Sequence, residues 1–227
     1  MEYFSAGELY DLVERKGAMD EAAARHCFRQ ILLGASHLHR HGVAHRDLSL
    51  ENVLLDSSGR CVLIDLGMCL RLPVSCDPAD ADRRVLVASQ GVYGKRNYIA
   101  PEILEGSKPF DAIKVDVWAL GIMLFIMLTG VPPFEAASPV NTAYRMICAG
   151  HTAEVLEEWN IRVSSSALDL IGRILRADPE ERPSISQILA HEWMMDDRAV
   201  RGVPGILRKW SRQLFQYEVS SLSLPPS

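Results

Sequence analysis

The chain has 227 residues, of which 48% are apolar and 23% charged, and this composition is that of a globular protein, not an intrinsically disordered one. Its length favours one compact unit. Lys plus Arg number 24 against 29 Asp plus Glu, a net charge of −5, so charge favours neither nucleic-acid nor broad membrane binding, and we expect local, specific partners.

Targeting and redox signals are weak along the whole chain. Five cysteines are spread without a CxxC pair, which argues against a disulfide framework or a zinc site and favours a reducing compartment. The N-terminal stretch MEYFSAGELYDL lacks the basic start and apolar run of a secretory signal. The longest apolar run, 117–128, is too short to cross a bilayer. We therefore expect no membrane span and a cytoplasmic location, with the nucleus as the alternative.

The first strongly periodic segment predicts a helix that begins after Asp20 and ends near Gly42. Asp20 is a good N-cap, and apolar residues follow at helical spacing, namely Phe28, Ile31, Leu32, Ala35 and Leu38. Two short apolar runs come next, NVLLD and CVLID, joined by the turn-like SSGR. They predict a small β-hairpin whose second strand ends at Asp65.

Residues 67–99 show neither helix nor strand periodicity, and we expect a functional or disordered loop there. The stretch VDVWALGIMLFIMLTG is apolar on all sides, which predicts a helix buried in the middle of the core. Amphipathic patterns then predict helices at about 139–150, 164–176 and 183–190. The sequence therefore indicates a mainly helical architecture with one small hairpin.

Five motifs follow one another along the chain: HRDLSLEN, IDLG, APE at 100–102, DVWALG and DPEERP. In this order and spacing they resemble the eukaryotic protein kinase family, and the likeness covers about residues 1–195. It is greatest to the calcium/calmodulin-dependent group of Ser/Thr kinases. The resemblance implies a mainly α C-terminal lobe with a small β-hairpin, then a tail at 196–227, with the N-terminal β lobe missing because the chain starts at the hinge.

The resemblance also implies an activity, the ATP- and Mg²⁺-dependent phosphorylation of Ser/Thr hydroxyls in protein substrates. Phosphoryl transfer depends on positioning and charge neutralisation. Asp47 would orient the hydroxyl and take its proton, while Asn52 and Asp65 would hold the metal ions. The alternative for Asp47 and Asp65 is a role as turn and cap residues. Arg46 would pair with a phosphorylated side chain of the activation segment, or it is a surface arginine that braces the loop.

Nucleotide contacts are implied by the resemblance alone. Leu9 and Leu54 would flank the adenine ring, although core packing is the commoner role of a leucine. Backbone groups of Glu2 and Phe4 would bind the adenine edge. Glu8 would support the first helical turn and the ribose.

Two buried structural contacts are also implied. Glu102 and Arg182 resemble the ion pair that joins the activation segment to the helical lobe. Asp116, on the buried helix, would accept hydrogen bonds from the backbone of the catalytic loop.

The chain departs from the family at two positions that face the transferred phosphate. Ser/Thr kinases carry a lysine two residues after the catalytic aspartate and a threonine in a G-T-x-x-Y segment. This chain has Ser49 and, within GKRNY, Lys95. We hypothesise that the hydroxyl and the ammonium have changed places. The alternative is that Lys95 is a solvated loop residue and the site is weakened.

Two smaller departures lie nearby. Leu66 replaces the usual phenylalanine of Asp-Phe-Gly and is expected to pack against His45. The position of the usual activating phosphothreonine falls near Gly91, so Ser89 or Tyr93 would have to serve instead.

The small lobe normally supplies a Gly-rich loop, a strand lysine and a helix glutamate. Their absence favours an incomplete gene model, because Asp47, Asn52 and Asp65 are all retained. The alternative is a catalytically inactive, pseudokinase-like interaction module.

Substrate and regulatory contacts are weaker inferences. Glu8 and Glu51 match acidic positions that bind an arginine three residues before the acceptor, whereas Arg145 lies where a third acid is common. Residues 198–217 hold five basic and no acidic residues, with one apolar helical face formed by Ile206, Leu207, Trp210 and Leu214. Such a pattern can indicate a calmodulin target or an autoinhibitory contact, but more often it indicates a helix docked on its own domain.

Overall fold

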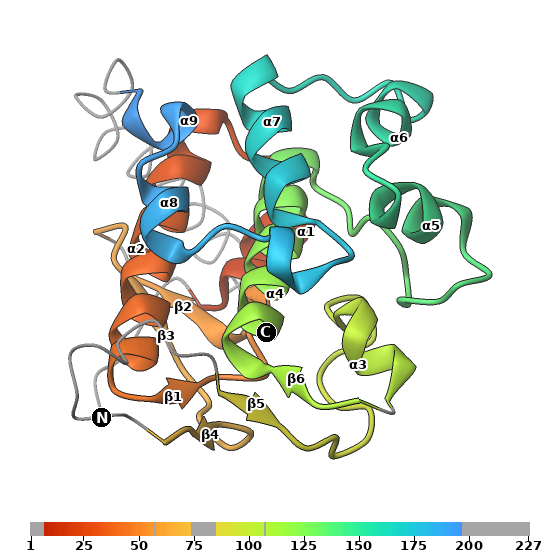
Figure 1. The fold of residues 1–227 in the computed structure, drawn as a ribbon. Helices are drawn as coiled ribbons and strands as arrows, with labels where there is room; N and C mark the ends of the chain where they lie inside the picture. The colour runs from red at the N-terminus through yellow and green to blue at the C-terminus, as the bar shows by residue number, and fades with distance from the viewer. Residues whose placement is uncertain (1–6, 57, 74–84, 107, 197–227) are drawn as a thin grey trace, which may run out of the picture.

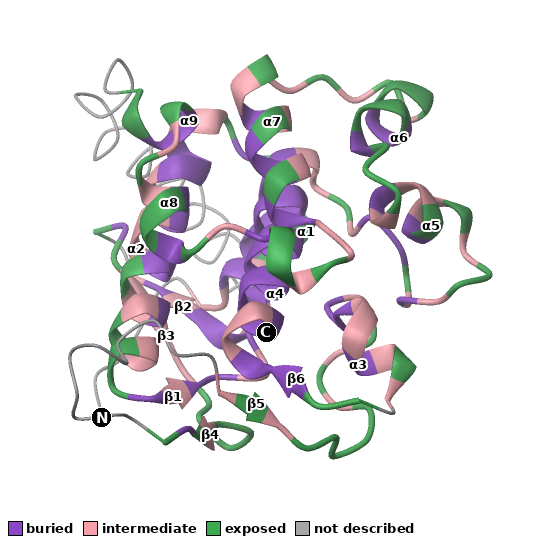
Figure 2. Ribbon diagram, in the orientation of Figure 1, coloured by how far each residue is buried: buried purple, intermediate pink, exposed green. Residues whose placement is uncertain are grey.

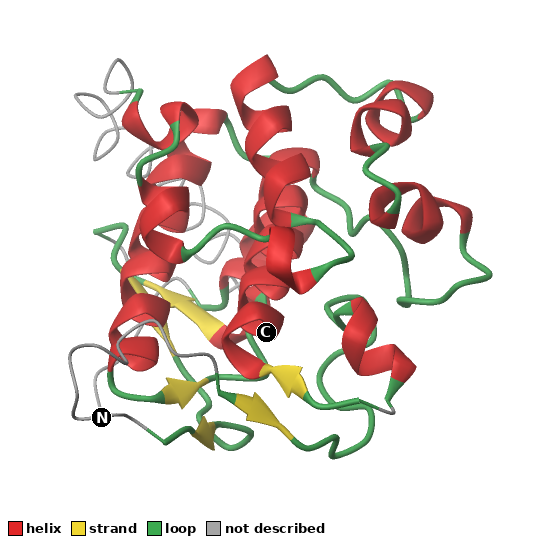
Figure 3. Ribbon diagram, viewed as in Figure 1, coloured by secondary structure: helices red, strands yellow, loops and turns green. Residues whose placement is uncertain are grey.

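The computed structural model describes residues 7–56, 58–73, 85–106 and 108–196. Within them, helices pack around one central helix, and short strands gather near one end of the helices (Figures 1 and 3). The expected contacts of Glu2 and Phe4, and the basic segment 198–217, lie outside the described residues. The expected mainly helical lobe with a small hairpin is confirmed for the described part of the chain.

The central helix is α4 (Ala112–Thr129), and every residue from Val115 to Leu128 is buried. It begins where the Asp111 carboxylate accepts the N–H groups of Ile113 and Lys114, and it ends at Gly130 with φ 79°. Figure 2 shows it buried along its length among the other helices. By length and composition alone it could cross a membrane, with mean hydropathy 1.9, but 89% of it is buried inside the domain. The predicted core helix is confirmed.

Helix α2 (Glu21–Arg40) packs against α4 and leads to the loop that carries Asp47. Asp20 caps it as expected, because its Oδ1 accepts the Ala23 N–H over 2.9 Å. Its buried face includes the predicted residues Phe28, Ile31, Leu32 and Ala35. Gly42 follows with φ 66°, so the chain turns there into β1 (Val43–Ala44).

The predicted hairpin is formed by β2 (Val53–Leu55) and β3 (Cys61–Leu63), which pair antiparallel with Val53 opposite Leu63. The segment before α1 (Leu9–Lys16) runs beside this hairpin. Leu55 N donates to Gly7 O over 2.9 Å, and Glu8 forms a bridge with Leu54. The entry to α1 therefore lies along the edge of β2.

Part of the 67–99 segment is regular, although its sequence shows no helix or strand periodicity. Strand β4 (Leu70–Arg71) pairs with β1, and β5 (Leu86–Val87) pairs with β6 (Phe110–Asp111). A two-residue strand is too short to show a period in the sequence, since its pairing depends on a distant partner. Residues 74–84 lie outside the described part.

The three predicted amphipathic helices are confirmed with shorter bounds, as α5 (Thr142–Cys148), α7 (Ser165–Ile174) and α8 (Ile185–Leu189). Sequence patterns did not predict three more, α3 (Pro101–Glu105), α6 (Thr152–Glu158) and α9 (Glu192–Met195). Of these helices, α8 and α9 lie beside α2, α7 packs on α4, and α5 and α6 lie across α4 from α2 (Figure 1). Single turns of 3₁₀ helix occur at η1 (Leu50–Asn52) and η3 (Pro179–Glu181). These unpredicted helices are too short for a periodic face to stand out.

Candidate active site

Asp116 of α4 holds the backbone of the loop between β1 and η1. The Asp116 carboxylate accepts the backbone N–H groups of His45 and Arg46, each over 2.8 Å. Its Oδ2 also lies 2.8 Å from His39 Nε2 at the end of α2. Asp116 is only 1% exposed, so these contacts are shielded from water. The expected role of Asp116 is confirmed, and His39 is an additional partner that the sequence did not reveal.

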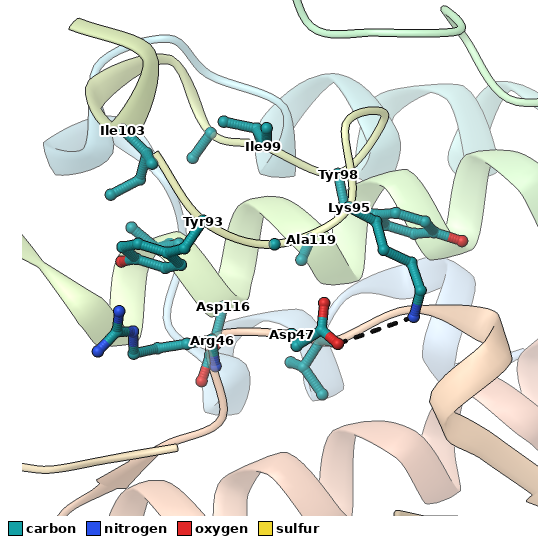
Figure 4. A pocket seen from close by; sticks show the side chains of 13 residues that line it. Arg46, Asp47, Tyr93, Lys95, Tyr98, Ile99, Ile103, Asp116 and Ala119 are labelled. Atoms are coloured by element: carbon teal, nitrogen blue, oxygen red, sulfur yellow. Dashed lines mark hydrogen bonds and ion pairs between the residues drawn. The ribbon is translucent and has the colours of Figure 1, made fainter. Parts of the chain in front are cut away.

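The backbone at Arg46 is held in an uncommon conformation. Its φ is 66°, a value that non-glycine residues adopt rarely and at some cost in energy. The two hydrogen bonds to Asp116 hold the backbone in this state. The turn directs the Arg46 and Asp47 side chains to the side of the loop that faces residues 93–98 (Figure 4).

Asp47 and Asn52 are bonded to each other. Asn52 Nδ2 donates to the Asp47 backbone carbonyl over 2.7 Å and to Asp47 Oδ2 over 2.9 Å. Asn52 is buried, while the Asp47 side chain remains 17% exposed. Asn52 therefore fixes the Asp47 carboxylate through its Oδ2 atom.

Lys95 and Ser49 meet beside the same carboxylate. Lys95 Nζ donates to Ser49 Oγ over 2.7 Å and lies 3.8 Å from Asp47 Oδ2. Figure 4 shows the ammonium reaching down from the 93–98 segment to Asp47. Ser49 is fully buried, and the Lys95 side chain is 34% exposed. Lys95 therefore contacts Ser49 and Asp47 while about a third of its side chain stays exposed.

Asp65 follows the hairpin strand that lies next to Asn52. Ile64 N donates to Asn52 O over 3.0 Å, so Asp65 is one residue beyond the paired backbone. Its φ is 61°, and its Oδ1 accepts the Gly67 N–H over 3.0 Å. Asp65 is exposed, and its carboxylate is accessible to a ligand.

Asn52 and Asp65 carry oxygen atoms of the kind that bind a divalent cation. Carboxylate and amide oxygens are the protein ligands that Mg²⁺ prefers, usually one or two alongside phosphate oxygens and water. Within the described ranges, no three His, Cys, Asp or Glu side chains gather as a metal cage. Asn52 uses its Nδ2 toward Asp47, which leaves Oδ1 as a possible ligand beside Asp65.

The residues expected around adenine have different environments. Leu54 is half-buried and pairs with Glu8, so part of its side chain is accessible. Leu9 is fully buried in the hydrophobic core. The structure therefore gives Leu9 the alternative role, core packing, and leaves it no surface for a ligand.

The predicted pair of Glu102 and Arg182 is present and bidentate. Arg182 Nη1 and Nη2 donate to the two Glu102 oxygens over 2.7 Å each. The remaining three N–H groups of the guanidinium bond to backbone carbonyls, those of Lys114, Ala177 and Arg176. All five donors are satisfied although the side chain is fully buried, so the pair joins the entry of α3 to the α4 region.

Leu66 differs from the expected packed side chain, because it is 50% exposed while His45 is buried. The His45 ring instead lies with Nε2 3.1 Å from Ile64 O. Residues 65–69 are all exposed, so Leu66 belongs to a turn at the surface.

Tyr98 is a site residue that the sequence analysis missed. Its hydroxyl accepts the Leu50 N–H over 3.3 Å and donates to Glu51 Oε2 over 3.2 Å. Burial raises the pKa of Tyr98 well above its usual range, and the Glu51 charge raises it further. The neutral hydroxyl therefore links GKRNY to η1. Its place in that motif was the only available signal.

Comparison with known proteins agrees with this geometry. The protein kinase domain family matches residues 1–194. The chain is 36% identical over 197 residues to CBL-interacting protein kinase 1 of Oryza sativa subsp. japonica, covering 87% of this chain and 40% of that protein. It is 36% identical over 193 residues to the SNF1-related protein kinase catalytic subunit alpha KIN12 of Arabidopsis thaliana, covering 85% and 35%.

A third relative is serine/threonine-protein kinase PKH3 of Eremothecium gossypii, which is 34% identical over 193 residues, covering 85% of this chain and 25% of the relative. The chain thus spans at most 40% of the length of these relatives. The match nevertheless covers nearly all of the described residues and includes the loop of Asp47 and the turn of Asp65. The chain belongs to the eukaryotic protein kinase family.

Proposed function

We propose that this chain carries the catalytic face of an ATP- and Mg²⁺-dependent protein serine/threonine kinase. The observation that supports it most is the arrangement around the Asp47 carboxylate, which Asn52 holds at 2.9 Å and Lys95 faces at 3.8 Å. A carboxylate that is fixed yet partly exposed suits a group that orients a hydroxyl and accepts its proton.

In this proposal each group has one task. Asp47 Oδ1 accepts the hydrogen bond of the substrate hydroxyl and takes its proton as the phosphoryl group is transferred. Asn52 and Asp65 hold Mg²⁺, which supplies charge neutralisation on the nucleotide phosphates. Leu54 and Glu8 lie together at the hairpin edge, on the side proposed for adenine and ribose.

Lys95 supplies the positive charge toward the transferred phosphate, and Ser49 supplies the hydroxyl that holds the lysine. The 2.7 Å contact between Lys95 Nζ and Ser49 Oγ supports the exchange of these two groups. Preorganised charge of this kind stabilises negative charge as it develops in the transition state.

The proposed substrate is a protein Ser or Thr with an arginine three residues before it. Glu8 and Glu51 are half-buried acids near the site, and Tyr98 binds one oxygen of Glu51. Arg145 is exposed and donates to Thr142 Oγ1 over 3.4 Å, so it adds no acidic group. We expect the arginine preference to be modest, and a peptide array indifferent to arginine there would refute it.

The basic segment 198–217 is proposed as a calmodulin-binding or autoinhibitory segment, on its sequence pattern alone. Calcium-dependent binding of a synthetic 198–217 peptide to calmodulin tests the first role. Inhibition of the kinase by the same peptide tests the second.

The central experiment separates nucleotide binding from phosphoryl transfer. A ligand that binds the folded chain raises its unfolding temperature, so Mg-ATP should stabilise the parent and Asp47→Asn. Asp65→Asn should lose the Mg²⁺-dependent part of the shift. The parent should transfer labelled phosphate from ATP to Ser/Thr peptides, and Asp47→Asn should not. Arg173→Ala is the surface control and should behave like the parent.

A parent that shows neither a shift nor transfer, alone or preceded by a kinase small lobe, would favour the interaction module instead. The gene offers a second observation. An in-frame G-x-G-x-x-G and V-A-x-K upstream of Met1 would support the enzyme.

A further inference from the structure

Arg46 is held by neutral groups. Its Nη1 donates to Gln90 Oε1 over 2.7 Å, and its Cζ lies 3.9 Å from the centroid of the Tyr93 ring. Figure 4 shows the Arg46 guanidinium beside the Tyr93 ring, on the side of the pocket away from Lys95. A cation this close to an aromatic face is attracted by the ring's π electrons.

The tyrosine acts through its ring, not through its hydroxyl. Tyr93 Oη is buried and has no hydrogen-bond partner in the described part of the chain. Burial raises the pKa of Tyr93 to about 12, so the hydroxyl is neutral at physiological pH and forms no ion pair with the guanidinium. No described carboxylate forms an ion pair with Arg46 either.

Both partners of Arg46 are tied to other parts of the fold. The chain before Gln90 is anchored by the pairing of β5 with β6 and by Ser89 Oγ, which donates to Gly106 O over 2.6 Å. The Tyr93 ring lies 5.9 Å from the ring of Phe110 in β6. Two residues after Tyr93, Lys95 contacts Ser49 and Asp47. Arg46 therefore lies between an anchored strand and the reactive carboxylate.

We propose that Gln90 and Tyr93 are positioning residues that hold Arg46 and place residues 86–95 against the catalytic loop without a phosphorylated side chain. The hydrogen bond and the ring contact occupy the arginine that would otherwise pair with a phosphate. Asp47 is next to Arg46 in the chain, so a shift of this arginine moves the carboxylate. This inference rests on the proposed kinase function where it is tested by kcat, whereas its hydrogen-exchange test does not need activity.

Two matched substitutions at each position test it. Tyr93→Phe keeps the ring and loses only the unpartnered hydroxyl, so activity should match the parent. Tyr93→Leu removes the ring, and kcat should fall about 10- to 100-fold with the KM for ATP nearly unchanged, because misplacement of a catalytic group by about 1 Å is costly. Gln90→Glu keeps an acceptor oxygen and should retain activity, while Gln90→Leu should lose it.

A readout without catalysis keeps the two proposals distinguishable. Backbone hydrogen exchange of residues 86–98, measured on the full chain, should be faster in Tyr93→Leu and Gln90→Leu than in the parent, with exchange in α7 unchanged. If the parent transfers no phosphate, the exchange result still decides the role of Gln90 and Tyr93. Equal exchange and equal kcat in parent and leucine variants would overturn the proposal.

A phosphatase experiment decides the competing possibility. The active parent is treated with a protein phosphatase. Its activity and the mass of its 85–95 peptide are measured before and after treatment. Unchanged activity supports the proposal. Loss of activity together with loss of one phosphate from that peptide would overturn it, because a phosphate would then be the partner of Arg46.

Discussion

Arg182 and Glu102 are joined by two hydrogen bonds of 2.7 Å, and the guanidinium is completely buried while the carboxylate is 15% exposed. Arg182 Cζ also lies 5.1 Å from the centroid of the Trp118 ring in α4. Removing one partner of a buried pair leaves the other charge uncompensated. The pair therefore holds α3 to the core, and removing either side chain should strongly destabilise the fold.

Arg182→Met should lower the free energy of unfolding by about 3–5 kcal/mol, as measured by urea titration. Arg173→Ala is the control, since its pair with Asp169 is 61% and 46% exposed, and it should cost about 0–1 kcal/mol. The double variant Arg182→Met with Glu102→Gln should be more stable than Arg182→Met alone. If Arg182→Met and Arg173→Ala lowered the unfolding free energy equally, the buried pair would not have this stabilising role.

Two helical glycines should respond to alanine with opposite signs. A Cβ at Gly121 of α4 would lie 2.6 Å from Ile174 Cγ2 and 2.7 Å from Leu175 Cδ2, whereas one at Gly172 of α7 would meet nothing within 4 Å. Overpacking a core costs about 1–3 kcal/mol, and alanine gains about 0.5–1 kcal/mol over glycine in a helix. Gly121→Ala should therefore destabilise the chain and Gly172→Ala stabilise it, by thermal or urea unfolding.

Two tyrosine hydroxyls provide a second matched pair. Tyr98 Oη bonds to Leu50 N and Glu51 Oε2, so Tyr98→Phe leaves a buried N–H unpaired and should cost about 1–3 kcal/mol. Tyr93 Oη has no hydrogen-bond partner among the described residues, so Tyr93→Phe should change the unfolding free energy by less than about 0.5 kcal/mol. If Tyr93→Phe proved the more costly change, the Tyr93 hydroxyl would have an unrecognised role.

Glu21 gives a prediction for the pH dependence of stability. Burial alone would raise the pKa of Glu21, but hydrogen bonds from Ser164 N, Trp193 Nε1 and Ser164 Oγ, each within 2.8 Å, bring it below the ordinary 4.5. A carboxyl with a lowered folded pKa adds stability above its unfolded pKa and loses it as pH falls through the folded value.

Glu21→Gln should therefore destabilise the chain at neutral pH, and its difference from the parent should shrink below pH 4.5, the ordinary value of this carboxyl. Urea titrations across this range measure it. Glu157→Gln, at an exposed position of α6, should track the parent at every pH. A constant difference between parent and Glu21→Gln would rule out the linkage.

The proposed exchange of Lys95 and Ser49 predicts that kcat lost by one substitution can be partly restored by restoring the family's residues. With a kinase small lobe placed before the chain, Lys95→Met should lower kcat about 100-fold, the usual cost of removing one group that stabilises transition-state charge. The double variant Ser49→Lys with Lys95→Thr should recover part of that loss. Turnover of Lys95→Met equal to the parent would refute the exchange.

Much of the fold could be predicted where the signal is local. The Asp20 cap and five apolar residues at helical spacing are enough to predict α2, and the run from Val115 is enough to predict the buried α4. The turn SSGR between two apolar runs was enough for the hairpin. These elements are long, capped or punctuated by turn residues, so their patterns survive without tertiary contacts.

What could not be predicted depends on partners distant in the chain. Strands β4 and β5 depend on pairing with β1 and β6. The exposure of Leu66 belongs to a surface turn, residues 65–69, that the sequence did not reveal. The family spacing predicted that Lys95 and Ser49 would lie together, but not that Gln90 and Tyr93 would hold Arg46. Such contacts leave no periodic trace in the sequence.

Asp116 lies 71 residues after His45 and 70 after Arg46, yet its two carboxylate oxygens bind both of their N–H groups. The loop that carries Asp47 thus acquires its shape only once the middle of the polypeptide has reached the same place. Contacts of such long sequence separation form late when a chain collapses, because closing a long loop costs entropy. The shape of this loop should therefore arise as one of the last events of folding, after the chain has become compact.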